Sequence, residues 1–508
     1  MSSIAPSPTI NARAPVNIFS VTALCRLLAM AIVLLAGLAH AQPMGRAEAR
    51  LLLTRTSYAA SESEIDRFSA LSRAQAVERL LSWVGREPGV PPPAWTAHYE
   101  RPEREDLMAP EAREAYRKEQ RQRALELRAW WFAEMLTTPS PLTEKMTLFW
   151  HNHFVSAQQK VRIAHLMYAQ NQLLRTHALG NFRTLLHGIA HDPAMLIYLD
   201  LAGSRSEAPN ENFAREVMEL FTLGEGHYSE RDIKEAARAM TGWGVNRDTG
   251  EPVFRPRQHD AGIKTVFGQS GRYDLDAVLD LLLARPETAE FISAKLWKEF
   301  VSPTPDPVAV KRFAAVFRDA HYEIKPLLKA LLTSDAFYAA DNRGTLVKSP
   351  VDLIVGTLRE FRFQVNEPAP FVNALRQLGQ DLFNPPNVKG WPGGDAWIHS
   401  SSLLGRKQLL ERLFRFEQPA GIAPMQSSTA TTSGEAAPAP RPVRALGGMN
   451  GSVEFNSALW LAEFQESADG SRMMAAALLP LPPVQATAAP PSLSGIRQIV
   501  LDPAYQLK

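Results

Sequence analysis

The chain has 508 residues, 45% hydrophobic and 21% charged, a balance typical of a folded protein with one large domain or two to three smaller ones. Its 55 lysines and arginines against 53 aspartates and glutamates leave almost no net charge, which argues against general nucleic-acid binding. A single cysteine in the whole chain excludes an internal disulfide.

The N-terminus has the order of a targeting segment. Arg26 precedes an apolar run at 27–38, and Ala39-His40-Ala41 resembles a signal-peptidase site. We expect residues 1–41 to be a cleaved signal peptide and the product to be periplasmic or secreted, without a membrane span. An uncleaved anchor is the alternative. Cys25 precedes the apolar run, so a lipoprotein anchor is not expected, and cleavage leaves no thiol for metal binding or catalysis.

The next hundred residues predict charged helices. Three-and-four spacing of apolar residues predicts a helix over 45–58 and a long one over 111–136. Ser61 followed by Glu64 is typical of a capping box and predicts a helix start there. The prolines and charges of 85–110 predict a loop between these helices.

Ser140-Pro141 predicts the start of a helix that runs into FWHNHF at 149–154. His151 and His153 are candidate metal ligands in this block. Residues two apart on a helix point about 200° apart, so both could bind one ion only in an extended segment. The alternative is that one histidine packs or caps while the other is exposed. Three contiguous letters HNH are not the scattered motif of an HNH nuclease.

The stretch PNENFAREVMELFTLGEGHYSERDIKEAARAMTGW predicts two amphipathic helices joined by a glycine turn. Asn210 is suited to be the N-cap of the first helix, and Gly224 to accept the left-handed conformation that ends it. Ser229 and Asp232 form a predicted capping box for the second helix, which we expect to continue to Trp243.

The polar face of the first central helix carries most of the candidate site. The candidates there are catalytic Glu216, Glu219 and Arg215 and ligand-binding Asn210 and Asn212. We expect this face to turn inward toward the two histidines and the loop at 259–264, with a carboxylate as general acid or base tuned by Arg215. Two alternatives remain: a solvated face with a Glu211–Arg215 i,i+4 pair, or a salt-bridge network between helices.

The residues after Trp243 lose the helical pattern. Glycines, prolines and short alternations in 245–271 predict a small hairpin or ordered loop. His259 and Asp260 are further candidate metal ligands, and Lys264 and Trp243 are candidate ligand-binding residues. The alternative is a loop whose side chains satisfy backbone groups.

The remaining chain returns to helices around one rigid loop. We expect helices over 166–177, 182–191, 194–199, 275–283, 287–300, 308–320, 324–334, 350–363 and 370–378.

In the loop at 384–394, Trp391 is a candidate to line a pocket, as is Trp397 beyond it; both could instead cover the core. Residues 418–445 are rich in Ala, Pro, Ser and Thr and predict a disordered insert. Residues 446–508 predict short segments that dock on the 42–417 body.

Several blocks resemble the bacterial family called domain of unknown function 1800. They are FWHNHF, PNENFAREVMELFTLG, YSERDI, AARAMTGW, HDAGIKTVFG, NPPNVKGWPGG and the final LDPAYQLK. The resemblance extends from about residue 45 to the last residue. It implies a mostly helical exported protein and a possible role beside another exported protein, but no catalytic residues, because the family has no established activity.

The expected fold is therefore mainly α, a large multi-helix body with a minor β-hairpin or loop insertion. The first functional hypothesis is an extracytoplasmic enzyme that depends on a divalent metal, for which no complete signature such as H-E-x-x-H is present, or on the helix carboxylates. The second is a binding protein for another exported protein or a glycan, in which tryptophans line the binding face.

Overall fold

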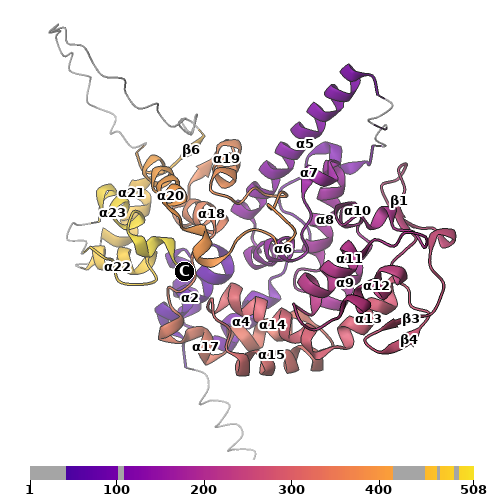
Figure 1. The fold of residues 1–508 in the computed structure, drawn as a ribbon. Helices are drawn as coiled ribbons and strands as arrows, with labels where there is room; N and C mark the ends of the chain where they lie inside the picture. Colours follow the sequence, from indigo (N-terminus) through magenta and orange to yellow (C-terminus); the bar gives the residue numbers. More distant parts are fainter. Residues whose placement is uncertain (1–41, 101–103, 105–107, 416–451, 466–468, 486–490) are drawn as a thin grey trace, which may run out of the picture.

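The computed structural model describes residues 42–100, 104, 108–415, 452–465, 469–485 and 491–508. This part of the chain is mainly helical, with β structure limited to three two-stranded sheets, which confirms the predicted fold class (Figure 1). The predicted signal peptide at 1–41 and the insert at 418–445 lie outside the described residues. No helix among the described residues combines the length and apolarity needed to cross a membrane.

The helices follow one another with short connections through most of the chain. The first half contains α2 (Gly45–Ser57), α3 (Glu62–Ser69), α4 (Arg73–Ser82), α5 (Pro110–Thr137), α6 (Pro141–His153), α7 (Gln158–Val161), α8 (Ala164–Thr176), α9 (Phe182–Ala190), α10 (Pro193–Tyr198), α11 (Glu211–Glu216) and α12 (Glu230–Ala239). The second half contains α13 (Leu275–Ala284), α14 (Pro286–Phe300), α15 (Pro307–Asp319), α16 (Ile324–Leu332), α17 (Asp335–Tyr338), α18 (Pro350–Glu360), α19 (Ala369–Gln377), α20 (Ser400–Leu413), α21 (Ser457–Gln465), α22 (Gly470–Leu478) and α23 (Leu493–Val500).

Local sequence signals start several of these helices where they were predicted. Both predicted capping boxes form, at Ser61 and at Ser229, each with its side chain accepting from the backbone N–H three residues on. Pro141 occupies the first turn of α6, where a backbone N–H would have no acceptor within the helix, so the N–H that proline lacks is not missed. The loop predicted at 85–110 contains one 3-10 turn, Ala94–Ala97, where the structure describes it.

The β structure after α12 consists of two separate small sheets. β1 (Trp243–Val245) pairs antiparallel with β2 (Pro252–Phe254), and β3 (Lys264–Val266) pairs with β4 (Gln269–Gly271). The second central helix therefore ends at Ala239, and the prediction that it reaches Trp243 was wrong. The ring of Trp243 packs edge-on against His191 instead, with centroids 4.4 Å apart.

The third sheet joins the end of the chain to the helical body. β5 (Gln364–Val365) pairs with β6 (Val453–Glu454), and α21, α22 and α23 follow beside them (Figure 1). The Trp460 ring N–H donates to the Glu360 carbonyl at 3.1 Å, and the Tyr505 hydroxyl lies 2.9 Å from that of Thr357.

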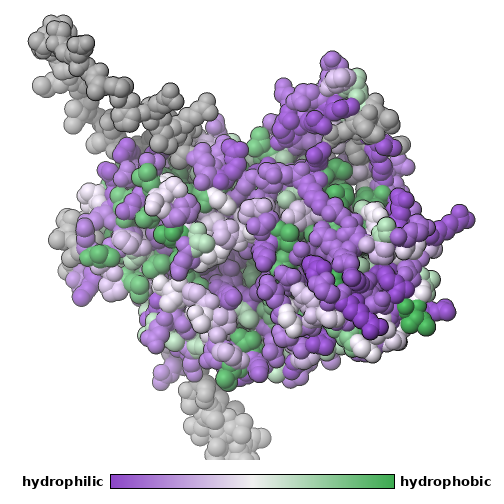
Figure 2. Space-filling model, in the orientation of Figure 1, coloured by the Kyte–Doolittle hydropathy of each residue, from purple (hydrophilic) through white to green (hydrophobic). Residues whose placement is uncertain are grey.

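One continuous core of buried hydrophobic side chains includes residues of both the body and these C-terminal helices. The face seen in Figure 2 is largely hydrophilic, with hydrophobic residues in separate patches.

Candidate functional site

A cavity of about 540 Å³ lies between α6, α14, the loop at 389–397 and the chain around 346–352. Charged and aromatic side chains line it: Lys145, Lys295, Lys298, Lys389, Lys508, Glu299, Asp352, Asp395, Phe149, His153, Trp391 and Trp397. Three of the sequence blocks quoted above, FWHNHF, NPPNVKGWPGG and LDPAYQLK, each contribute lining residues. The tertiary structure thus brings to one place blocks that are far apart in sequence.

His153 and Lys295 form a hydrogen-bonded pair in this cavity. The Lys295 Nζ lies 3.0 Å from His153 Nδ1 and 3.3 Å from the Leu220 carbonyl oxygen. On the other side of the ring, His153 Nε2 lies 3.1 Å from the Phe221 carbonyl, an acceptor, so Nε2 carries the proton. Nδ1 is therefore the nitrogen with the free lone pair, and it faces the Lys295 nitrogen.

The two carbonyls that hold this pair belong to an unusual helical turn. After α11 the helix continues as a π-helix, Val217–Thr222. The Thr222 hydroxyl donates to the Val217 carbonyl at 2.6 Å, and the Leu223 N–H donates to that of Met218, so the last turn is one residue wider than an α-helix. Such turns are frequent at functional sites, and the last carbonyls of a helix need partners from elsewhere in the fold.

Burial favours the uncharged form of both His153 and Lys295. Burial, followed by the charge of Lys295, lowers the pKa of His153 well below its usual range. Burial, followed by the charge of Lys298, lowers the pKa of Lys295 to about 8. At neutral pH, His153 is a neutral imidazole, and a fraction of Lys295 is a free amine.

A second group of lysines in the lining of the cavity, Lys145 and Lys508, is neutralised by Asp352. Asp352 accepts hydrogen bonds from Lys145 and Lys508, the latter at 2.7 Å, and all three side chains are buried. Burial alone would raise the pKa of Asp352, but these two ammonium groups outweigh it and hold the pKa well below its usual range. Glu299 lies 3.6 Å from Lys508. Within the described residues, neither Lys295 nor Lys298 forms an ion pair with a carboxylate.

The loop at 389–397, the tryptophan loop, is hydrogen-bonded to α6 through Asn152. The Asn152 Oδ1 accepts from the Trp391 backbone N–H at 2.6 Å. Gly390 has a φ of +91°, and a Cβ there would lie 2.3 Å from Asn152 Oδ1, so only glycine fits. Trp391 is 4% exposed, and its ring N–H is buried without an acceptor among the described residues.

Replacing Gly390 with alanine is expected to detach this loop. The left-handed backbone alone costs an alanine about 1–2 kcal/mol, and the contact with Asn152 adds to that. Gly393→Ala is the matched control, because its Cβ meets nothing within 4 Å and its φ is −123°. Thermal unfolding and tryptophan fluorescence should change for Gly390→Ala only. Equal changes in both variants would contradict this account of the loop.

The charged side chains of the 210–222 stretch for which partners are known bond to one another, to α12 and to the turn before it, and not to His151 or His153. Arg215 pairs with Glu230 on α12 at 2.7 Å and with Glu211 at 3.4 Å, and Glu219 accepts from the Tyr228 hydroxyl at 2.9 Å. This is the salt-bridge network that was the alternative. The hydrogen bond between this stretch and His153 is made by the Phe221 carbonyl and not by a carboxylate.

Three other predicted residues of this stretch take structural or peripheral positions. Asn210 caps α11 by accepting from the Asn212 N–H at 2.9 Å, and Asn212 donates to the Leu199 carbonyl at 3.4 Å. Glu216 is half-buried, and burial followed by the charge of Glu219 raises its pKa. None of the three lines the cavity.

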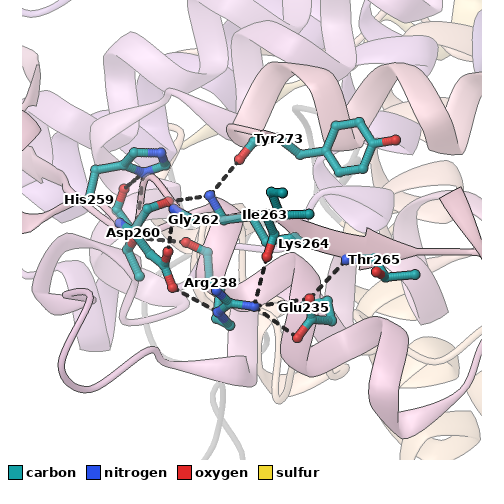
Figure 3. A network of polar contacts seen from close by, with 10 residues as sticks. Glu235, Arg238, His259, Asp260, Gly262, Ile263, Lys264, Thr265 and Tyr273 are labelled. Atoms are coloured by element: carbon teal, nitrogen blue, oxygen red, sulfur yellow. Dashed lines mark hydrogen bonds and ion pairs between the residues drawn. The ribbon is translucent and has the colours of Figure 1, made fainter. Parts of the chain in front are cut away.

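The loop residues predicted as a site form a separate network (Figure 3). Asp260 accepts from Arg238 of α12 at 2.7 Å, and His259 Nδ1 lies 3.0 Å from the Thr241 carbonyl. The ammonium of Lys264 is buried and donates to two backbone carbonyls, those of Asp260 and, at 2.9 Å, Tyr273. These side chains tie the loop to α12 and satisfy its backbone, which was the alternative prediction.

The predicted metal ligands do not converge. His151 and His153 both lie within the helix α6 and face different partners, since His151 Nε2 is bonded to Asn171 at 3.0 Å. His259 and Asp260 belong to the network of Figure 3. Among the described residues, no three His, Cys, Asp or Glu side chains are grouped so that they could hold a metal ion. Each ring nitrogen of His153 has a hydrogen-bonding partner, the Phe221 carbonyl for Nε2 and Lys295 for Nδ1.

Of the residues predicted to belong to a site or to line a pocket, the cavity contains His153, Trp391 and Trp397. The sequence-based prediction missed Lys295, Lys298, Lys145 and Asp352. Lys295 and Lys298 are three residues apart on α14, which places them on one helix face. That spacing is equally common on solvated surfaces, so only the approach of His153 distinguishes this pair.

Comparison with known proteins gives the chain a family but no activity. A family model described as "Protein of unknown function (DUF1800)" matches residues 51–506, nearly the whole of the described structure. Neither the curated proteins nor the solved structures gave a match. The match covers both the helical body and the C-terminal helices, and it includes every residue of the cavity except Lys508. The chain belongs to the DUF1800 family of proteins of unknown function.

Proposed function

We propose that this chain is an exported protein that binds a small organic anion in the cavity between α6, α14 and the tryptophan loop. The observation that carries the proposal is the pair Lys295 and Lys298, two neighbouring cations without a carboxylate partner among the described residues. An anion brought within about 4 Å of one of them gains about 4 kcal/mol at an effective dielectric constant of about 20, before desolvation.

The shape and lining of the cavity support an organic ligand. Its volume of about 540 Å³ is in the range of small-molecule sites, which are mostly apolar with a few placed polar groups. Phe149, Trp391 and Trp397 supply aromatic surface, and the buried ring N–H of Trp391 offers a hydrogen bond to a ligand oxygen. An aromatic carboxylate or a sugar acid meets these requirements.

Binding is a better-supported function than metal- or carboxylate-dependent catalysis. Glu211 is paired with Arg215 and Glu219 accepts from the Tyr228 hydroxyl, and the candidate metal ligands lie apart. Export rests on the order of Arg26, the apolar run and Ala39-His40-Ala41 in the sequence. A role beside another exported protein remains compatible with a ligand-binding cavity.

The test uses protein recovered from the exported fraction, whose N-terminal residue is expected to be Gln42. Calorimetric titration should show that phenylacetate and D-glucuronate bind at least about tenfold more tightly than phenylacetamide and glucose, since a full charge adds about 1.4 kcal/mol or more. Lys298→Glu should weaken binding of the anions by about tenfold or more. Lys311→Glu, on the exposed face of α15, is the matched control.

Two results would overturn the proposal. The first is that neither anion binds. The second is that Lys298→Glu binds the anions as tightly as the wild-type protein and the control Lys311→Glu do.

A further inference from the structure

Lys295 has the surroundings of a nucleophile rather than those of a lysine that only neutralises charge. Its nitrogen lies 3.0 Å from the unprotonated Nδ1 of His153, and the Phe221 carbonyl orients that ring through Nε2. A nucleophile, a base within hydrogen-bond reach and a third group that orients the base are the geometric signature of covalent catalysis. The three come from α14, α6 and the π-helix.

The hydrogen bonds of Lys295 leave an electron pair available in the free amine. A neutral amine has two N–H bonds and one lone pair, and the two acceptors here are His153 Nδ1 and the Leu220 carbonyl. The remaining lone pair is then free for a reactant in the cavity that Lys295 lines. A lysine whose role was only to cap the Leu220 carbonyl would need neither the imidazole nor the cavity.

The charges around Lys295 favour the free amine. On its own helix, Lys298 repels the ammonium form, and on α6 the facing group is the neutral His153. The nearby carboxylates do not compensate, because Asp352 is held by Lys145 and Lys508, and Glu299 lies 3.6 Å from Lys508. Burial and a second cation lower the pKa of Lys295 to about 8, which is how imine-forming lysines are activated.

We propose that Lys295 attacks the carbonyl carbon of a small aldehyde- or ketone-bearing organic anion bound in this cavity and holds it as an imine. The proposal rests on the proposed function and specifies the ligand further. The N–C bond forms as the carbonyl π bond opens, and His153 Nδ1 relays one proton from the nitrogen of the adduct to its oxygen, which gives a carbinolamine. His153 Nδ1 then relays the second amine proton to the departing hydroxyl, so that water leaves and the C=N bond forms. No oxidant or reductant is needed.

The experiment is reductive trapping with pyruvate and sodium cyanoborohydride, which converts an imine to a stable carboxyethyl-lysine. Peptide mass mapping should show Lys295 modified at least about tenfold faster at pH 7.5 than Lys311, the internal control. The rate should be half-maximal near pH 8. Lys295→Arg should abolish the modified peptide, and Lys298→Gln should slow trapping at pH 7.5 and move the half-maximal pH upward. Folding of each variant is checked by thermal unfolding.

The outcomes separate this inference from the proposed function. Phenylacetate has no carbonyl group that condenses with an amine, so its binding tests anion recognition alone. Phenylacetate binding together with trapping of Lys295 no faster than Lys311 overturns the imine and leaves the binding proposal standing. An unchanged pH profile in Lys298→Gln overturns the activation argument. Absence of both phenylacetate binding and selective trapping overturns both proposals.

Discussion

Glu144→Ala is expected to destabilise the protein by about 3–5 kcal/mol, because it leaves a buried guanidinium without its counter-ion. Glu144 accepts from Arg175 at 2.7 and 2.8 Å, and both side chains are almost completely buried. The same carboxylate accepts from the Trp131 ring N–H at 2.9 Å, and Arg175 continues through Asn171 to His151. The substitution therefore breaks a network that connects α5, α6 and α8. Denaturant unfolding measures the loss.

Two further variants show whether the lost charge pairing is the cause. Replacing both Glu144 and Arg175 by methionine removes both charges and should restore much of the stability, since a buried ion pair is often no better than apolar side chains of similar size. Glu114→Ala, which removes an exposed partner of Arg121, should have little measurable effect. A double variant as unstable as Glu144→Ala would show that packing, not charge, dominates at this position.

The protein is expected to lose stability as the pH falls below about 6.5, because His151 and His153 are buried neutral. Burial, followed by the charge of Arg175, lowers the pKa of His151 to about 3, and that of His153 is also far below its usual range. Between those values and about 6.5 the unfolded chain binds protons that the native state does not. Each histidine therefore contributes stability that is complete above about pH 6.5 and declines by about 1.4 kcal/mol per pH unit below it.

Two buried acids act in the opposite direction. Burial raises the pKa of Asp192 to about 7 and raises that of Glu360, so each is protonated more readily in the native state, which gains relative stability as the pH falls. Asp192→Asn removes one of these opposing groups and keeps an oxygen for the Met195 N–H. Its loss of stability on acidification should thus be steeper than that of the unmodified protein.

Denaturant midpoints at pH 7.5, 6 and 5 measure how steeply the wild-type protein and Asp192→Asn lose stability as the pH falls. Nitrogen NMR spectra of the imidazole rings follow the protonation of His151 and His153 directly. Their signals should stay those of neutral rings to pH 5 in the native state and titrate near pH 6.5 in urea. Protonation of either ring in the native protein at pH 6, or equal slopes for the two proteins, would contradict the burial argument.

The sequence by itself determined most of the helices and where those helices begin, although it did not predict α4, α7, α17 or α20. The capping boxes at Ser61 and Ser229, Pro141 in the first turn of α6 and the glycine at 224 act on residues within six positions along the chain. Such signals are local, so they can be read without knowledge of the tertiary structure. Apolar periodicity likewise showed which side of α11 is buried, since Phe213, Ala214 and Val217 all face the core.

Only the tertiary structure decided which polar groups meet. The sequence predicted neither the π-helix nor the strand at Trp243, since both depend on partners contributed by packing. His153 and Lys295 are 142 residues apart, and nothing near either one indicates the other. Their altered pKa values come from burial, which periodicity cannot specify for a polar side chain on a helix face. The carboxylates at 211–219 were predicted as a site because their spacing lets them converge, yet Glu211 pairs with Arg215, which also pairs with Glu230, and Glu219 accepts from the Tyr228 hydroxyl. Local hydrogen bonds and spacing build each helix, whereas a site forms where helices distant in sequence pack and exclude water.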